Sequence, residues 1–148
     1  MGTFPTGVTV VTAMDEDGAP LGLTVNSFTS VSLDPPLVLV CIDTKSNSHD
    51  RLVASGSFTV NVLAAEHDAL ARRFASNPAE GRFDGLGWIP GPTGAPILDG
   101  MAAWLACTVE EVYPGGDHSI VLGRVTEARA TPAPALLFHR GTLGALEP

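Results

Sequence analysis

A run of small hydroxyl and amide side chains is the feature of the sequence that most suggests chemistry. It covers residues 24–32 and leads, through two prolines, into a short apolar segment at residues 37–42. That segment is typical of a buried strand, because it is rich in branched side chains and stopped by proline upstream. Polar groups buried beside such a strand need hydrogen-bond partners, and an oxygen-rich anionic ligand supplies them. We therefore expect a ligand site along this run.

A second polar stretch, residues 43–49, precedes a short helical pattern over residues 49–55 that Gly56 is placed to end. A serine or asparagine at positions 46–48 is suited to cap this helix. Free backbone N–H groups at a helix N-terminus, next to Lys45, favour a phosphate there. An ordinary capped helix explains the same residues, so the pattern alone leaves both interpretations open.

Other common chemistries find little support in the sequence. No Gly-x-Gly-x-x-Gly follows a predicted strand and no Walker lysine occurs, so neither a Rossmann domain nor a P-loop is indicated. The histidines and cysteines are not spaced as zinc ligands, and no Gly-x-Ser-x-Gly elbow is present. Asp34 and Asp43 do not make a credible acid pair. We expect no metal site.

Predicted strands and turns position these polar stretches. Residues 7–14 alternate valine with threonine, and residues 15–18 have the composition of a turn leading into residues 21–24. Residues 76–96 are rich in glycine and proline, which predicts a long surface loop. Within it, Arg82, Phe83 and Trp88 either pack back onto the rest of the protein or contact substrate. Further strands are expected at residues 58–63, 104–113, 119–129 and 136–139, and a second short helix at residues 66–75. This succession favours a mainly β, antiparallel barrel.

The composition narrows the class of protein. The chain has 148 residues, 45% hydrophobic and only 16% charged, with a mean hydropathy of +0.23. One domain with little surface charge suggests that apolar area is hidden in a subunit interface, although a small monomer with a large core fits too. A net charge of −8 opposes binding to nucleic acid or anionic membranes. Without a signal segment or spanning run, a cytoplasmic enzyme is expected.

Five motifs occur in the order found in one known family, across nearly the whole chain. They are Phe4-Pro5-Thr6-Gly7-Val8-Thr9-Val10-Val11-Thr12, the run from Asn26-Ser27-Phe28 to Pro36, Phe58-Thr59-Val60-Asn61-Val62-Leu63, Gly116-Asp117-His118 and Phe138-His139-Arg140-Gly141. The sequence therefore resembles the flavin reductase-like family, the FMN-binding split-barrel proteins that include the reductase components of two-component flavin monooxygenases. The resemblance implies a mainly β, antiparallel split β-barrel with two or three short helices, as one domain over residues 1–148, without the helical lead-in that family members usually carry.

The resemblance also implies a flavin site. The residues lining the flavin are Asn26, Ser27, Phe28, Thr29 and Ser30, with Ser32 and Leu33 continuing the wall. The phosphate end is held by Asn47, Ser48 and His49. Cys41 either faces the ring from the adjacent strand or is plain core. Cys41 and Cys107 both lie in apolar runs, as free buried cysteines do, and the sequence leaves a disulfide between them open.

The nicotinamide residues implied by the resemblance are His118, Phe138, Arg140 and Gly141. His118, the one residue expected to act in catalysis, stacks on or hydrogen-bonds to the carboxamide or ribose, and Arg140 pairs with the pyrophosphate in a fork geometry. In the alternative without a nicotinamide role, His118 caps a hairpin and Arg140 forms ion pairs with local carboxylates.

The expected function is an NAD(P)H:flavin oxidoreductase, since a bound isoalloxazine carries the redox chemistry and needs few side-chain groups. It uses FMN or FAD with NADH or NADPH, supplies reduced flavin to a flavin-dependent monooxygenase partner, and forms a homodimer. The alternative is a tight flavin-binding electron carrier or storage protein without nicotinamide activity, and a cofactor-free dimeric interaction module is a third, weaker interpretation.

Overall fold

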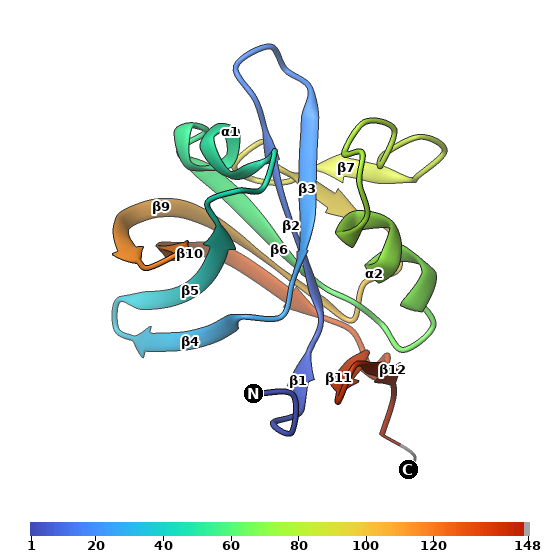
Figure 1. The fold of residues 1–148 in the computed structure, drawn as a ribbon. Coiled ribbons are helices and arrows are strands. Elements are labelled where there is room, and N and C mark those ends of the chain that lie inside the picture. The colour runs from blue at the N-terminus through green and yellow to red at the C-terminus, as the bar shows by residue number, and fades with distance from the viewer. Residues whose placement is uncertain (147–148) are drawn as a thin grey trace.

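A computed structural model describes residues 1–146, in which strands predominate (Figure 1). Seven strands form one antiparallel sheet in the order β3-β2-β6-β9-β10-β5-β4. Their bounds are Thr9–Met14 (β2), Pro20–Val25 (β3), Phe28–Leu33 (β4), Pro36–Asp43 (β5), Ser57–Val62 (β6), Ala103–Gly115 (β9) and His118–Ala130 (β10). The same residues include two short helices, α1 (His49–Ala54) and α2 (Asp68–Ala75). The predicted mainly β, antiparallel architecture is confirmed.

The connection between β3 and β4 forces the sheet to curl. These strands are the outermost members of the sheet, yet only Asn26 and Ser27 separate them in the sequence. A link of this length spans roughly 10 Å, so the two edges meet at that end. Beyond the link β3 and β4 diverge (Figure 1). A sheet closed at one end and open at the other agrees with the predicted split barrel.

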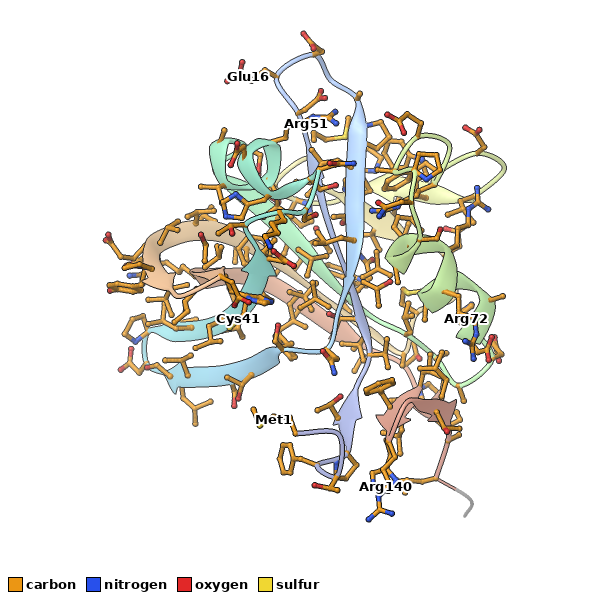
Figure 2. All side chains as sticks on the ribbon, in the orientation of Figure 1. Met1, Glu16, Cys41, Arg51, Arg72 and Arg140 are labelled. Atoms are coloured by element: carbon orange, nitrogen blue, oxygen red, sulfur yellow. The ribbon has the colours of Figure 1, made fainter. Side chains whose placement is uncertain are left out.

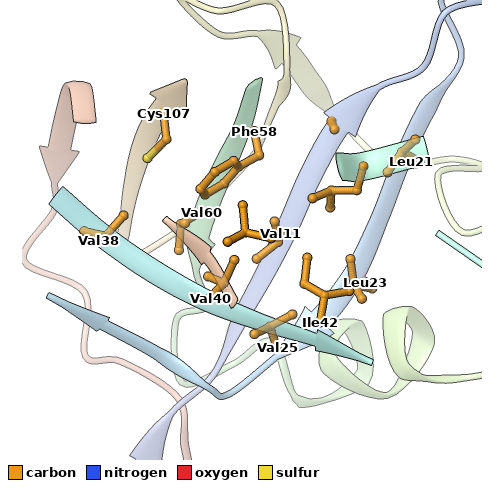
Figure 3. Close-up of a cluster of buried hydrophobic side chains, with 13 residues drawn as sticks. Val11, Leu21, Leu23, Val25, Val38, Val40, Ile42, Phe58, Val60 and Cys107 are labelled. Atoms are coloured by element: carbon orange, nitrogen blue, oxygen red, sulfur yellow. The ribbon is translucent and has the colours of Figure 1, made fainter. Parts of the chain in front are cut away.

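The barrel interior is filled by apolar side chains from facing strands (Figure 3). Val11 of β2, Val40 of β5, Phe58 of β6 and Val121 of β10 are fully buried there. Gly123 on β10 leaves room for Phe58, because a Cβ at that position would lie 2.5 Å from Phe58 Cζ. Close packing of this kind makes the interior the main source of the barrel's stability.

A second apolar layer covers the outside of β2. Val10 packs there with Ala71 and Phe74 of α2 and with Leu136 near the C-terminus. Strand side chains alternate between faces, so β2 sends Val11 inward and Val10 outward and is buried on both sides. The helix α2 is therefore held on the outer face of the barrel.

Residues 76–96 are less irregular than the sequence suggests. They contain β7 (Trp88–Pro90), which pairs with β8 (Pro96–Leu98), and β8 is buried. Phe83 packs edge-on against Phe74 with ring centroids 5.1 Å apart, and Trp88 packs against Phe83 at 6.3 Å. The prediction missed this hairpin because strands of three residues that contain proline are too short to show the alternation of apolar and polar residues that marks a strand. Phe83 and Trp88 pack back onto the barrel, one of the two interpretations open to the sequence.

A small sheet joins the two ends of the chain. It consists of β1 (Thr6–Gly7), β11 (Leu137–His139) and β12 (Thr142–Gly144) in the order β1-β11-β12. Arg140 and Gly141 form the two-residue loop between β11 and β12, with φ of 51° and 81°. Two successive positive φ angles are those of a type I′ hairpin turn. Arg140 therefore adopts a conformation that few side chains other than asparagine and aspartate favour.

Asn61 on β6 is a motif residue with a structural role. Its side chain is fully buried, donates to Val10 O and Thr12 Oγ1 at 3.1 Å, and accepts from Leu98 N at 2.9 Å. A buried amide satisfied in this way fixes β8 against β2 and β6. The Phe58–Leu63 motif therefore belongs to the scaffold.

Candidate functional site

Two adjoining hollows lie along the outer side of β3. The first, which we call the polar cleft, has a volume of about 410 Å³ and is lined by Asp43, Lys45, Ser46, Asn47, Ser48, Asn77 and Arg82, among others. The second, the apolar hollow, has a volume of about 340 Å³ and is lined chiefly by Val8, Ala71, Phe138 and Leu143. Thr24 of β3 and Ala75 of α2 line both spaces, so the two are neighbours.

A third space, the loop hollow, adjoins the polar cleft on another side. It has a volume of about 380 Å³ and lies between β3 and the turns at residues 79–84. Asn47, Ser48 and Arg82 line both the loop hollow and the polar cleft. These three residues therefore stand where two spaces large enough for ligand groups meet.

The connection between β5 and α1 supplies most of the polar cleft. Asp43 Oδ1 accepts a hydrogen bond from Lys45 N at 2.8 Å, which fixes the turn at the end of β5. Thr44 ties the turn to the tip of the β9–β10 hairpin through its backbone N–H and its hydroxyl. Ser48 takes the N-cap position of α1 without a capping side-chain bond. Among residues 1–146, no partner holds the side chain of Asn47 or Ser48, so both remain able to bind a ligand.

His49 fastens α1 to the barrel. Its Nδ1 lies 2.7 Å from Asp50 Oδ1 and its Nε2 lies 2.8 Å from Ser119 Oγ on β10. Both ring nitrogens are therefore engaged within the chain, and the ring would have to give up a bond to reach a phosphate. Its role at the phosphate end stays a prediction.

His118 lies at the mouth of the β9–β10 hairpin, opposite Asp43 of β5 in the strand register. Its side chain is 41% exposed and its Nδ1 lies 2.7 Å from Asp117 Oδ1. The hydrogen bond from His118 lowers the pKa of the Asp117 carboxyl, and the charge of a protonated ring acts in the same direction. The ring is thus oriented by a carboxylate while part of its surface remains open to a ligand.

The other predicted nicotinamide residues lie at the opposite end of β10. Phe138 and Gly141 line the apolar hollow together with Asn26, and Arg140 forms the adjoining turn (Figure 2). β10 has 13 residues, which at about 3.3 Å per residue extends roughly 40 Å. Within one chain, therefore, the structure brings Asn26, Phe138 and Gly141 together but does not bring His118 to them.

The polar run at residues 24–32 lies largely at the surface. Thr29, Ser30 and Leu33 of the edge strand β4 are exposed, and Ser32 is half-buried. Water therefore reaches these hydroxyls on the edge strand, and they do not need a ligand to satisfy their hydrogen bonds. Ser27 Oγ donates to Cys41 O at 2.8 Å, and Phe28 packs against the barrel core. That these residues line a flavin stays a prediction.

The two cysteines differ in environment, and neither is in a disulfide within residues 1–146. Cys107 is buried, and desolvation raises its pKa to about 12, so the thiol is protonated and unreactive at neutral pH. Cys41 is half-buried on β5, beside Ser27. No group of three or more His, Cys, Asp or Glu side chains in the described part of the chain is arranged to hold a metal ion.

Sequence reasoning missed Ala75, and it gave Thr24 and Arg82 no definite role in these spaces. Thr24 and Ala75 join the polar cleft to the apolar hollow, and Arg82 is buried at the meeting of the polar cleft with the loop hollow. Thr24 Oγ1 donates to Ala71 O at 2.6 Å, which holds α2 against β3. The only signal for Arg82 was a basic residue before phenylalanine in a loop rich in glycine and proline, and burial cannot be read from that.

A split β-barrel with a polar cleft and an apolar hollow side by side defines a protein suited to a ligand that is anionic at one end and flat and apolar at the other. The comparison of sequences identifies which class this is. Residues 1–147 match the family described as "Flavin reductase like domain". The chain belongs to this family, as its motifs indicated.

Individual relatives agree with this assignment. The chain is 44% identical over 140 residues to a "Probable flavin reductase" of Rhizobium meliloti (strain 1021), covering 95% of this chain but only 45% of that protein's length. It is 42% identical to "Flavin-dependent monooxygenase, reductase subunit HsaB" of Rhodococcus jostii (strain RHA1), with 100% and 75% of the two chains covered. The structure of Streptomyces globisporus C-1027 "NADH:FAD oxidoreductase SgcE6 in complex with NAD and FAD fragments" superposes with a TM-score of 0.93 at 44% identity, covering 99% of this chain and 88% of that one.

Proposed function

We propose that the protein is an NAD(P)H:flavin oxidoreductase that passes a hydride from NADH or NADPH to FMN or FAD. The observation that carries this proposal is the adjacency of the polar cleft and the apolar hollow, which share Thr24 and Ala75, in a chain of the flavin reductase-like family. The names of the relatives, which include an NADH:FAD oxidoreductase, support the same activity.

The described residues fit a flavin, which when bound supplies the redox centre that accepts the hydride. Asn47 and Ser48 offer unpartnered donors in the polar cleft, and Arg82 carries a buried Nε without a partner among residues 1–146. Asn26, predicted to line the flavin, and Phe138, predicted to contact the nicotinamide, both line the apolar hollow, so the two flat rings would meet there. These residues bind and orient the ligand and exclude water, and the chain needs no acid–base pair for that work.

We further propose a homodimer, in which the apolar outer face of strands β5 and β10 packs against a second copy of the chain. Leu37, Leu39 and Cys41 of β5 are half-buried on the face turned away from the barrel interior, beside Ile120 and Leu122 of β10. In the described chain no helix covers this face (Figure 1). Pairing of two copies offers a way to unite His118 of one with the 138–141 segment of the other, which one chain keeps apart.

The proposed partner of the reductase is the oxygenase component of a flavin-dependent monooxygenase, which consumes the reduced flavin. The relatives named as reductase subunits of such monooxygenases support this interpretation. Within residues 1–146, neither helix has the length or the apolarity to traverse a lipid bilayer. The cytoplasmic location expected from the sequence is part of the proposal.

Anaerobic mixing of the protein with NADH or NADPH and with FMN or FAD tests the activity. We expect the NADH absorbance band and the flavin band to bleach together with at least one combination. His118→Ala should raise the nicotinamide KM more than it weakens flavin binding, and equal effects on both would remove the proposed role of His118. If no combination bleaches and the yellow colour survives extensive dialysis, the protein is a flavin carrier instead.

A further inference from the structure

Arg82 is a buried cation whose partners are all neutral. It lies in the turn that follows α2, is 8% exposed, and donates from Nη1 to Gly22 O at 2.8 Å and from Nη2 to Ser76 O. Its Nε is buried without a hydrogen-bond partner in the described part of the chain. A guanidinium has five N–H groups, so the two carbonyls leave further donors on the terminal nitrogens unused.

Among the arginines, Arg82 is unusual because it is buried and yet has no carboxylate partner among residues 1–146. Arg51, Arg72, Arg124 and Arg129 each lie within ion-pair distance of a carboxylate. Arg82 has no such partner among residues 1–146, although it is by far the most buried of these side chains. Desolvation lowers the pKa of Arg82, and the charge of the exposed Glu80 opposes this shift. A buried charge without a counter-ion is costly to keep, and it persists where an anion is to be bound.

The position of Arg82 shows where that anion would be. Its side chain lines both the polar cleft and the loop hollow, together with Asn47 and Ser48, and Lys45 lines the polar cleft beside them. We propose that Arg82 binds the phosphate of the flavin, together with the β5–α1 connection that lines the same cleft. This inference rests on the proposed function, because it takes the flavin as the ligand of the cleft.

The flavin phosphate is a better match than the pyrophosphate of the nicotinamide dinucleotide. The segment predicted to contact the dinucleotide, residues 138–141, lies at the apolar hollow, and Arg82 does not line that space. Arg82 instead shares its two spaces with Asn47 and Ser48, the predicted phosphate-end residues. The carbonyls of Gly22 and Ser76 hold the guanidinium in place before the ligand arrives, so little side-chain freedom remains to be lost on binding.

Binding of FMN and of riboflavin, which lacks the phosphate, separates this role from a structural one. For Arg82→Met we expect the FMN Kd, measured by quenching of flavin fluorescence, to rise roughly 10- to 100-fold, the range of one lost charge-assisted hydrogen bond. The riboflavin Kd should stay within about twofold, since only the phosphate contact is removed. Equal losses for FMN and riboflavin, or no loss for either, would overturn the proposal.

Arg73 provides a matched control. It also braces the turns at residues 79–84, donating from Nη2 to Gly81 O and Asp84 O, but it lines neither the polar cleft nor the loop hollow. Arg73→Met should therefore leave the ratio of the FMN and riboflavin Kd values unchanged. If the ratio of the FMN Kd to the riboflavin Kd rises as far in Arg73→Met as in Arg82→Met, loop bracing and not phosphate contact is responsible.

Arg82→Lys covers the case in which Arg82→Met does not fold. Lysine keeps the charge but loses the fork, so we expect intermediate FMN binding with unchanged riboflavin binding. Inorganic phosphate should raise the Tm of the wild type and raise that of Arg82→Lys less, and an equal rise in both would count against the site. The wild-type preference for FMN over riboflavin is independent of NADH turnover. A protein that keeps the preference but never oxidises NADH would refute the reductase activity and leave the role of Arg82 intact.

Discussion

The polar cleft and the apolar hollow adjoin each other on the outside of β3, yet they are built by different means. The cleft takes its polar residues chiefly from turns, with Lys45, Asn47 and Ser48 from the β5–α1 connection and Arg82 from the turns after α2. The hollow takes its walls from regular elements, chiefly α2 and the β11–β12 hairpin. Turns expose backbone and short polar side chains, whereas packed elements present apolar faces. The contrast suggests that one space selects a ligand by charge and the other by shape.

Phe74 supports both spaces, and its loss should have the largest effect. It is fully buried, lines the polar cleft and packs in the same apolar layer as Leu143 and Phe138. Phe74→Ala should lower the free energy of unfolding by about 3–5 kcal/mol, the usual cost of removing a buried phenylalanine. Urea unfolding followed by circular dichroism measures it. If folded Phe74→Ala protein binds only one of the two ligands more weakly, the two spaces do not both depend on Phe74.

Phe138→Ala should affect the apolar hollow alone. Phe138 is half-buried, so we expect a loss of about 1–2 kcal/mol in stability and a several-fold rise in the NADH KM, with the FMN preference over riboflavin unchanged. Leu137→Ala is the matched control, because Leu137 precedes Phe138 on β11 and does not line the hollow. If Leu137→Ala raises the KM equally, the hollow is not the nicotinamide site.

Arg140→Asn separates turn geometry from binding. Arg140 has a φ of 51° in a type I′ turn, a conformation that asparagine tolerates better. We expect the Tm to hold or rise, with a gain of up to about 1 kcal/mol, while the NADH KM increases if the guanidinium pairs with the pyrophosphate. Arg129→Asn removes an equal charge from the exposed end of β10 and should leave the KM unchanged. A rise in the KM for both variants would indicate a general charge effect instead.

The smallest effect is expected far from both spaces, at the surface pair of Glu110 and Arg124. The hydrogen bond from Arg124 lowers the pKa of Glu110 below 4.5. A carboxyl whose folded pKa is depressed stabilises the protein above its unfolded pKa, and this contribution is lost as the pH falls through the folded pKa. The Tm difference between wild type and Glu110→Gln should therefore be small at pH 7 and shrink as the pH falls below the ordinary pKa of glutamate and through the depressed pKa of Glu110. Flavin and nicotinamide binding should not change.

Local patterns predicted most of the secondary structure. The acidic turn at residues 15–18 joins β2 to β3, as expected, and its Asp15 Oδ1 accepts from Asp17 N and Ala19 N. The helix at residues 49–54 ends before Gly56, whose φ is 73°. The β9–β10 hairpin has the expected glycine-rich connection. Each of these features depends on residues close together in the sequence, which is why it could be recognised there.

The sequence by itself determined the alternation of strands, the turns, the family and the polar residues at positions 45–48. Only the tertiary structure decided that β3 and β4 are edges that meet, that residues 29–33 face water, and that Arg82 is buried against Gly22. The physical reason is that burial and electrostatic partners are set by contacts between segments far apart in the chain. A charge in a glycine-rich loop has the same local pattern whether it ends in solvent or at the wall of a ligand site.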